Sequence, residues 1–148
     1  MQKGFKIPKV TFRTRVGDEE GAFTPTCSSQ QLPGFEKEYN QIKLLAIDDI
    51  YCVSVNDSYV MNAWGKQMGI EQVKMIPDGS GNFTRFMGML IGKNHLGFGM
   101  RSWRYMAVIN DGVVEKWWQE PGINNEGLDD DPYVESTPKN VIDYLRAN

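Results

Sequence analysis

Residues 50–68 read IYCVSVNDSYVMNAWGKQM and place a short apolar strand directly before a capped helix. Ile50–Val55 is rich in β-branched and aromatic residues and is short enough for a buried strand. Asn56 and Asp57 can then cap a helix, whose apolar stripe consists of Tyr59, Val60, Ala63, Trp64 and Met68. Because a strand followed at once by a helix is the repeating unit of α/β folds, this stretch indicates an α/β sandwich.

Elements with the same two periodicities lie on both sides of this unit. Val10–Val16 alternates apolar and polar side chains, which predicts a strand with one dry face. We expect a helix to begin near Cys27, to bend at Pro33 and to continue on apolar residues at helical spacing. Downstream, Val73–Ile76 predicts a short strand that ends at the turn residues 77–81. The chain therefore alternates strands and helices.

The C-terminal third predicts a hairpin and a last helix. Arg104–Asn110 and Val113–Trp118 flank Asp111-Gly112, which is a strong signal for a two-residue hairpin turn. We interpret Glu120–Tyr133 as a solvated loop, because it contains prolines, glycines and an aspartate run, and we expect a helix over Pro138–Arg146. Strands separated by helices and closed by a hairpin predict a mixed sheet of the thioredoxin kind. A dinucleotide-binding fold is disfavoured, since its glycine fingerprint is missing.

Length and charge narrow the class of protein. At 148 residues with 41% hydrophobic side chains, the chain is long enough for a single domain over residues 1–148. The net charge is −3 and no basic block is present, so we do not expect nucleic acid as a partner. No apolar run approaches the about 20 residues of a membrane span. We therefore expect a soluble, cytoplasmic protein that binds no membrane.

Two cysteines, Cys27 and Cys52, carry the most reactive side chains. Their number and spacing match neither a secreted disulfide framework nor a zinc site, so we expect reduced thiols, no metal and no cofactor. The lack of a Cys-x-x-Cys motif excludes a dithiol oxidoreductase. Cys27 lies in the first turn of a predicted helix, where free backbone N–H groups and the helix dipole favour a thiolate. From position alone, a nucleophile and an ordinary packed cysteine are equally good interpretations.

Six segments of the chain carry a common family resemblance. They are GAFTPTCSS (21–29), LPGF (32–35), SVND (54–57), MNAWG (61–65), IPDGSG (76–81) and GFGMRSWRY (97–105). Together they resemble the type II peroxiredoxins, also called the peroxiredoxin-5 type, over residues 21–121. The resemblance implies a thioredoxin-like sandwich in which helices flank a mixed central sheet.

The family motif surrounds its reactive cysteine with a proline, a threonine and a distant arginine. Thr24 and Cys27 match the last two positions of the motif, and Arg104 matches the arginine. The resemblance implies that Cys27 is the peroxidatic cysteine, that Thr24 orients the peroxide and that Arg104 stabilises the developing charge. It also implies that Arg101 supports them. The implied activity is reduction of hydrogen peroxide and alkyl hydroperoxides through a sulfenic acid on Cys27.

Thiol acidity alone cannot supply the rate of such an enzyme. Lowering a cysteine pKa from about 8.5 to about 5.5 raises the thiolate fraction at about pH 7 roughly 30-fold. With a Brønsted slope of about 0.45, the same change lowers nucleophilicity about 20-fold and almost cancels the gain. Donors aimed at the peroxide oxygens must provide the rate, because removing one such donor costs about 100-fold or more. Thr24 and Arg104 are the candidate donors.

A sulfenic acid on Cys27 needs a second thiol to reduce it. Cys52 lies in the middle of a predicted strand, where burial is its expected role. Family members with an internal resolving cysteine carry it near the C-terminus, and residues 122–148 contain no cysteine. We therefore expect a one-cysteine cycle with an external thiol reductant, which the resemblance suggests is glutathione with glutaredoxin, or thioredoxin. The resemblance also suggests a homodimer.

The histidine and the tryptophans have structural interpretations. His95 is the only histidine and lies in a glycine-rich polar stretch, which indicates a surface position. Trp103, Trp117 and Trp118 indicate core packing or a dimer contact, because aromatic residues in a hairpin commonly serve those purposes.

The chain departs from the family before the active-site turn. The family carries a long apolar strand that ends in the motif proline, whereas Glu20 stands here in the proline's place. We expect Val10–Val16 to fill the place of that strand only partly, because burying its arginines is costly. A negative charge from Glu20 near Cys27 would disfavour the thiolate. Two alternatives to an active peroxidase stay open: a weakened homologue that binds a partner or senses oxidant, and a truncated product without activity.

Overall fold

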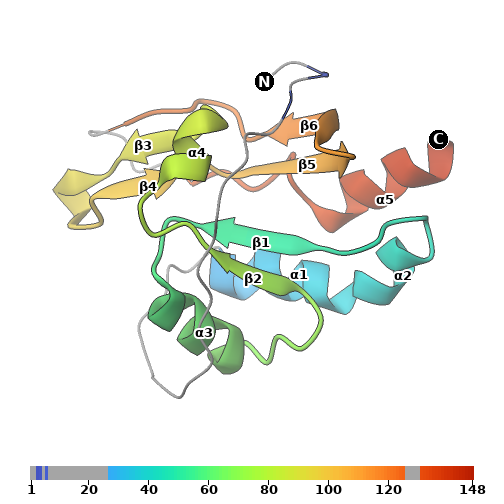
Figure 1. Ribbon diagram of the computed structural model, residues 1–148, viewed down its shortest axis with the longest axis horizontal. Coiled ribbons are helices and arrows are strands. Elements are labelled where there is room, and N and C mark those ends of the chain that lie inside the picture. Colours follow the sequence, from blue (N-terminus) through green and yellow to red (C-terminus); the bar gives the residue numbers. More distant parts are fainter. Residues whose placement is uncertain (1–2, 5, 7–26, 126–130) are drawn as a thin grey trace.

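The structure is a computed structural model that describes residues 3–4, 6, 27–125 and 131–148 (Figure 1). The predictions for Val10–Val16, Glu20 and Thr24 lie outside these residues. The strands are β1 (Tyr51–Ser54), β2 (Lys74–Pro77), β3 (Leu90–Gly92), β4 (Met100–Ser102), β5 (Tyr105–Asn110) and β6 (Val113–Gln119). The helices are α1 (Leu32–Lys37), α2 (Tyr39–Lys43), α3 (Ser58–Gln67), α4 (Asn82–Phe86) and α5 (Pro138–Ala147).

The strands associate in pairs that combine parallel and antiparallel ladders. β1 and β2 are parallel, with Cys52 opposite Met75. β3 pairs with β4, and β5 with β6, in antiparallel fashion, with Met106 of β5 opposite Trp118. Within the described residues no ladder joins one pair to another, so the mixed sheet expected from the sequence is present there as separate pairs. The α/β class is confirmed.

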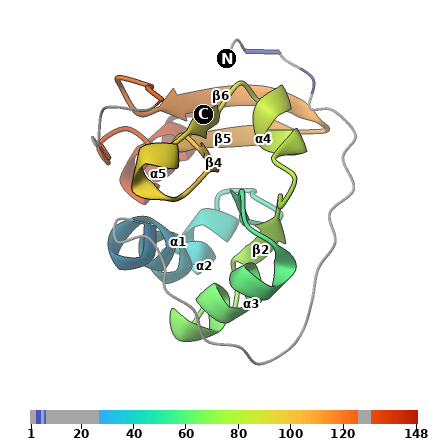
Figure 2. The same ribbon diagram turned by 90° about the vertical axis from the view of Figure 1, so that its left-hand side faces the viewer.

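The pairs are stacked in two halves that share one core. Figure 1 shows β5 and β6 above β1 and β2, and Figure 2 shows the same division from the side, with α1, α2 and α3 around the lower pair. One apolar cluster joins the halves through buried residues of α1, α3, β5 and α5, namely Phe35, Met61, Trp64, Val108 and Val141. Among the described residues, burial of these side chains rather than a strand ladder therefore joins the two halves.

The helix cap and the hairpin turn that the sequence predicted are both present. The Asp57 carboxylate accepts a hydrogen bond from the Val60 N–H (2.9 Å) and caps α3 as expected. At the hairpin turn, Asp111 and Gly112 have φ angles of 49° and 73°, the positive values that a type I′ turn requires. The predicted apolar stripe of α3 included Tyr59, and this prediction is wrong because Tyr59 is 48% exposed. Met61 faces the core instead.

The first helical segment bends at a different place from the predicted one. It opens with a wide π-type turn over Cys27–Gln31 and continues through α1, in which Pro33 is the second residue. The interruption falls at Glu38, between α1 and α2, rather than at Pro33. A proline near the start of a helix is tolerated because the N–H that it lacks would have no partner there.

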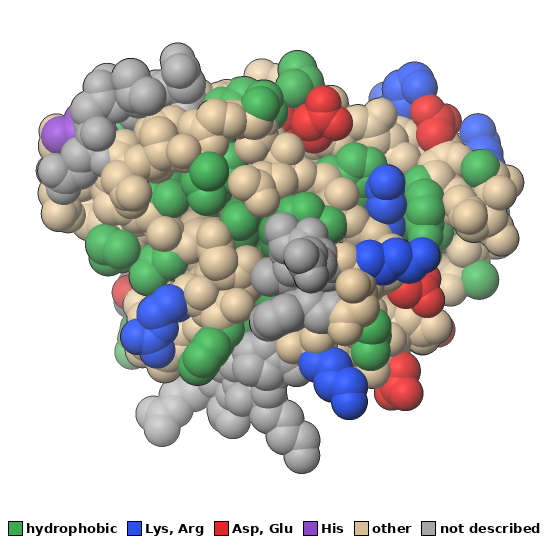
Figure 3. All heavy atoms as spheres, turned by 90° about the horizontal axis from the view of Figure 1, so that it is seen from above, with side chains coloured by type: hydrophobic (Ala, Val, Ile, Leu, Met, Phe, Trp, Pro, Cys, Tyr) green, Lys and Arg blue, Asp and Glu red, His purple; other side chains and the backbone are tan. Residues whose placement is uncertain are grey.

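The surface carries charges of both signs. Figure 3 shows Lys and Arg side chains next to Asp and Glu side chains mainly on the right-hand side of the face seen from above. His95 is exposed, as its polar surroundings in the sequence predicted. Among the described residues, no helix is both long and apolar enough to cross a membrane.

Candidate active site

Cys27 lies at the first residue of the π-type turn and is half-buried against the core. The next residue anchors this turn to α3, because the Ser28 hydroxyl accepts a hydrogen bond from the indole N–H of buried Trp64 (2.9 Å). Turns of the π type are rare in helices, and those that occur lie frequently at functional sites. The cysteine is therefore fixed in position and still partly accessible.

Arg104 is the charged partner of Cys27. Its Nη1 lies 3.0 Å from the Cys27 Sγ and 3.0 Å from the Gln31 Oε1, and it donates to both. Its Nε donates to the Pro132 carbonyl oxygen (3.2 Å), and its Nη2 forms an ion pair with Asp131. The Arg104 side chain is only 7% exposed. Arg104 and Cys27, which were both predicted as site residues from the sequence, are therefore in contact.

The surroundings keep Arg104 charged. Burial alone would lower the pKa of Arg104, but the neighbouring Cys27 and the Asp131 carboxylate outweigh burial and raise this pKa above its ordinary value. The arginine therefore holds a full positive charge next to the sulfur at every physiological pH. A cation in this position stabilises negative charge that develops on a group reacting at the sulfur.

The segment 131–136 is part of this site, and the solvated loop predicted over Glu120–Tyr133 is wrong at Glu120, whereas residues 121–125 are irregular and mostly exposed as predicted. Glu120 is 0% exposed, and its carboxylate accepts hydrogen bonds from the backbone N–H groups of Val134, Glu135 and Ser136 at 2.8–3.0 Å. Burial raises the pKa of Glu120, but these donors and the Ser136 hydroxyl lower it by more. The pKa of Glu120 therefore lies below its ordinary value, and the carboxylate is charged. Glu120 is therefore a buried structural residue, and Asp131 pairs with Arg104 from the surface.

Arg101 is placed differently from the expectation. Its Nη1 donates to the Val55 carbonyl oxygen (2.9 Å) and to the Asn56 Oδ1 (2.6 Å), so it braces the loop between β1 and α3. It also lines a hollow bordered by that loop and by β3 and β4. Its supporting role for Cys27 stays a prediction.

Cys52 belongs to the core side of the molecule, as predicted. It lies in β1 and packs against the same apolar cluster as Cys27. Burial raises the pKa of the Cys52 thiol to about 12, and the neighbouring Cys27 adds to the increase. Since the thiolate is the nucleophile, a thiol with so high a pKa is poorly suited to attack at neutral pH.

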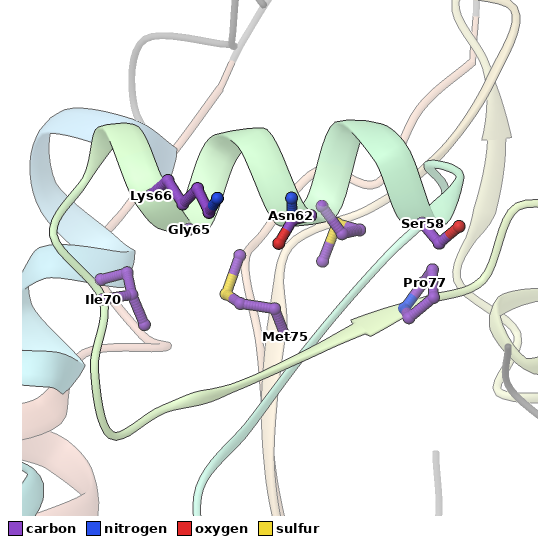
Figure 4. Close-up of a pocket in the computed structure, with 8 residues that line it drawn as sticks. Ser58, Asn62, Gly65, Lys66, Ile70, Met75 and Pro77 are labelled. Carbon is purple, nitrogen blue, oxygen red and sulfur yellow. The ribbon is translucent and has the colours of Figure 1, made fainter. Parts of the chain in front are cut away.

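A separate small cavity beneath α3 does not have the chemistry of an active site. Figure 4 shows that it lies between α3 and β2, with Ser58, Asn62 and Lys66 on one side and Met75 and Pro77 on the other. Its volume is about 160 Å³, and Lys66 is the one charged residue that lines it among the described residues. Cys27 and Arg104 lie elsewhere, so this cavity takes no part in their chemistry.

The pair of Cys27 and Arg104 on this scaffold defines a cysteine-dependent redox protein of the thioredoxin-like superfamily. A half-buried thiol at a helix start, beside a permanent cation, suits nucleophilic attack on a polarised bond. Comparison with known proteins gives the family, because the sequence profile named Redoxin matches residues 20–135. The chain belongs to the peroxiredoxins of type II, a family of thiol-dependent peroxidases.

Individual relatives agree with this assignment. Peroxiredoxin y4vD of Sinorhizobium fredii is 49% identical over 96% of this chain and 90% of its own length. Hybrid peroxiredoxin hyPrx5 of Haemophilus influenzae is 45% identical over 97% of this chain and 66% of its own length. The crystal structure of a Plasmodium falciparum antioxidant protein, titled a 1-Cys peroxiredoxin, has a TM-score of 0.81 and 43% identity over 88% of this chain and 76% of its own.

The alignments also bear on the departure noted in the sequence. The match to the Sinorhizobium relative runs over 171 residues, more than the 148 of this chain. The relative therefore carries residues inside the matched region that have no counterpart here. This agrees with a chain that is shorter than its family before the active-site turn.

Proposed function

We propose that the protein reduces hydrogen peroxide and alkyl hydroperoxides with Cys27 as the nucleophile. The observation that supports this most strongly is the 3.0 Å contact between the Arg104 Nη1 and the Cys27 Sγ, in a setting where the arginine is almost completely buried. A buried cation next to a thiol stabilises the thiolate and the charge that develops as a peroxide bond breaks.

The first step is a displacement at oxygen. The Cys27 thiolate attacks one oxygen of the hydroperoxide, an S–O bond forms and the O–O bond breaks. The sulfur is oxidised to a sulfenic acid that retains the peroxide proton, and the leaving alkoxide or hydroxide takes a proton from water. Arg104 stabilises the negative charge that moves from sulfur to the leaving oxygen. Thr24, three residues before Cys27 in the sequence, is the second donor in this proposal.

A one-cysteine cycle completes the reaction. An external thiol attacks the sulfenic acid and releases water, and a second thiol reduces the resulting mixed disulfide and regenerates Cys27. The raised pKa of Cys52 supports an external rather than an internal resolving thiol. Glutathione with glutaredoxin, or thioredoxin, is the proposed reductant. The homodimer and the cytoplasmic location stay predictions.

The test follows each thiol by mass spectrometry. The reduced protein and its Cys27→Ser and Cys52→Ser variants are mixed with an equimolar amount of hydrogen peroxide and quenched at increasing times. We expect the wild type and Cys52→Ser to gain one oxygen on Cys27 at least about 100-fold faster than a free thiol, and Cys27→Ser to stay unmodified.

Two results would contradict the proposal. Oxidation of Cys27 no faster than that of a free thiol would leave the binding or oxidant-sensing homologue as the better interpretation. A disulfide between Cys27 and Cys52 that forms within a catalytic turnover, with loss of turnover in Cys52→Ser, would rule out the one-cysteine cycle.

A further inference from the structure

The contacts of Arg104 point to a residue that acts on it from a distance. Asp131, Pro132 and the ring of Tyr133 all meet the guanidinium, the last with the Arg104 Cζ 5.7 Å from the ring centre. These three residues are consecutive and directly precede the backbone that Glu120 binds. Any group that fixes this backbone therefore also fixes three neighbours of the arginine.

Glu120 joins the arginine to this segment from both sides. Its backbone N–H donates to the Arg104 carbonyl oxygen (3.2 Å), and its carbonyl oxygen accepts from the Trp103 indole N–H (2.8 Å). Its carboxylate meanwhile accepts from three consecutive N–H groups, those of Val134, Glu135 and Ser136. A buried carboxylate with this many donors is a rigid joint, because each donor would lose its partner if the joint opened.

A second route from Glu120 reaches the arginine through Gln31. The Ser136 hydroxyl donates to the Glu120 Oε1 (2.8 Å) and accepts from the Gln31 Nε2 (3.2 Å). The Gln31 Oε1 then accepts from the Arg104 Nη1, the atom that also contacts Cys27. The amide orientation of Gln31 is thus fixed by Ser136 so that its oxygen faces the guanidinium.

We infer that Glu120 is a positioning residue that holds Arg104 against the Cys27 sulfur through the 134–136 backbone and the Ser136–Gln31 relay. The inference rests on the proposed function, but it concerns the placement of the cation. A displacement of about 1 Å in such a group can lower a rate about 100-fold. Replacing Glu120 by glutamine matters because the Val134 N–H contacts both carboxylate oxygens, so an amide nitrogen in either place would face this donor, and the other donors would lose a charged acceptor.

The experiment compares Glu120→Gln with Glu36→Gln. Glu36 is a matched control, because its carboxylate also accepts from three consecutive backbone N–H groups, those of residues 71–73, and within the described part of the chain these bonds do not involve the Arg104 network. Both variants are made in full-length Cys52→Ser protein, so that only Cys27 reports. One measurement is the rate of oxidation by hydrogen peroxide, and the other is the pH dependence of alkylation by iodoacetamide.

We expect Glu120→Gln to be oxidised about 10-fold more slowly or worse, and its alkylation midpoint to move upward by about half a pH unit or more. Glu36→Gln should change the oxidation rate less than about 2-fold and leave the midpoint in place. Equal effects of the two substitutions, or no effect of Glu120→Gln in a folded protein, would overturn the inference.

Two further features keep the test decisive. If Glu120→Gln does not fold, Ser136→Ala replaces it, since it removes only the relay hydroxyl and should slow oxidation several-fold with the same upward shift; an unchanged midpoint in Ser136→Ala would then reject the relay. The alkylation profile needs no peroxidase activity. Slow oxidation of the parent protein would therefore defeat the proposed function, while the profile would still decide the role of Glu120.

Discussion

Arg104 serves four polar neighbours through three nitrogen atoms, which only a guanidinium can do. The Cys27 sulfur and the Gln31 oxygen share Nη1, Asp131 takes Nη2 and the Pro132 carbonyl takes Nε. The fork shape of the side chain thus sets the direction from which the charge approaches the sulfur. A lysine ammonium, which is a compact charge of the same sign, could contact only some of these four neighbours.

Replacing Arg104 by lysine tests this geometry. We expect Arg104→Lys to keep the charge but to lower the rate of Cys27 oxidation by hydrogen peroxide about 100-fold, because the ammonium cannot contact the sulfur and the Asp131 side together. The control is Arg85→Lys on α4, where the arginine donates to the exposed Asn82 Oδ1. A rate above about one tenth of the wild-type value in Arg104→Lys would show that the fork shape is unimportant.

Site residues with a local motif could be predicted from the sequence, whereas those that depend on long-range contacts could not. Cys27 and Arg104, which the structure places in contact, were selected because they carry a recognisable motif and chemistry, while Thr24 stays a prediction. Gln31 was missed, although it follows Cys27 by four residues on the same helical face, a spacing that could have revealed it. Asp131 and Glu120 gave no local signal, since their roles depend on a segment that returns to the site after 105 residues, as measured from Gln31 to Ser136.

At the scale of elements, carboxylates replace missing backbone partners in loops. Asp78 is buried and accepts from the N–H groups of Phe83 and Thr84 at the start of α4. Glu36 does the same for the loop before β2. β1, α3, the β5–β6 hairpin and α5 were predictable from their own residues. α4, β3 and β4 were not, because their five, three and three residues are too few to show a periodic pattern.

The Glu36 contact predicts an acid dependence of stability. Burial raises the pKa of Glu36, but three backbone N–H groups lower it below 4.5, its ordinary value. Since the folded protein has the lower pKa, the stabilisation is complete above about pH 4.5 and disappears as the pH falls through the folded value. Glu36→Gln should lower the free energy of unfolding by about 1 kcal/mol at neutral pH, and this difference should shrink in acid.

Urea unfolding measured from about pH 7 to about pH 3 checks this expectation. The curves of the wild type and Glu36→Gln should converge at the acid end. A difference between the two proteins that stays constant with pH would mean that the Glu36 charge contributes nothing.

At the scale of the molecule, side-chain packing connects the two halves over the residues that the structure describes. No ladder joins β1 to β5 within the described residues, and one apolar cluster spans the space between their two pairs. The relatives carry additional residues within the matched region. The structural neighbours nevertheless superimpose well, so the scaffold keeps its shape without a described ladder at this position.

Replacing Met61 by alanine tests how far the stability of the fold depends on this packing. It is 1% exposed in the cluster, so Met61→Ala should lower the free energy of unfolding by about 3 kcal/mol and the melting temperature by about 6–12 °C. Met100, which is 49% exposed, provides the control, and Met100→Ala should change the melting temperature by less than about 2 °C. Similar melting temperatures for the two variants would argue against a packed core between the halves.

The return of segment 131–136 to Cys27 also sets the moment at which the thiol acquires its environment. During synthesis Cys27 leaves the ribosome long before Asp131 and Ser136, because about a hundred residues separate them. Until those residues emerge, Arg104 has neither its ion pair nor the carbonyl and amide contacts that aim it. A nascent chain therefore exposes an ordinary cysteine to cellular oxidants until segment 131–136 has emerged and packed against Arg104.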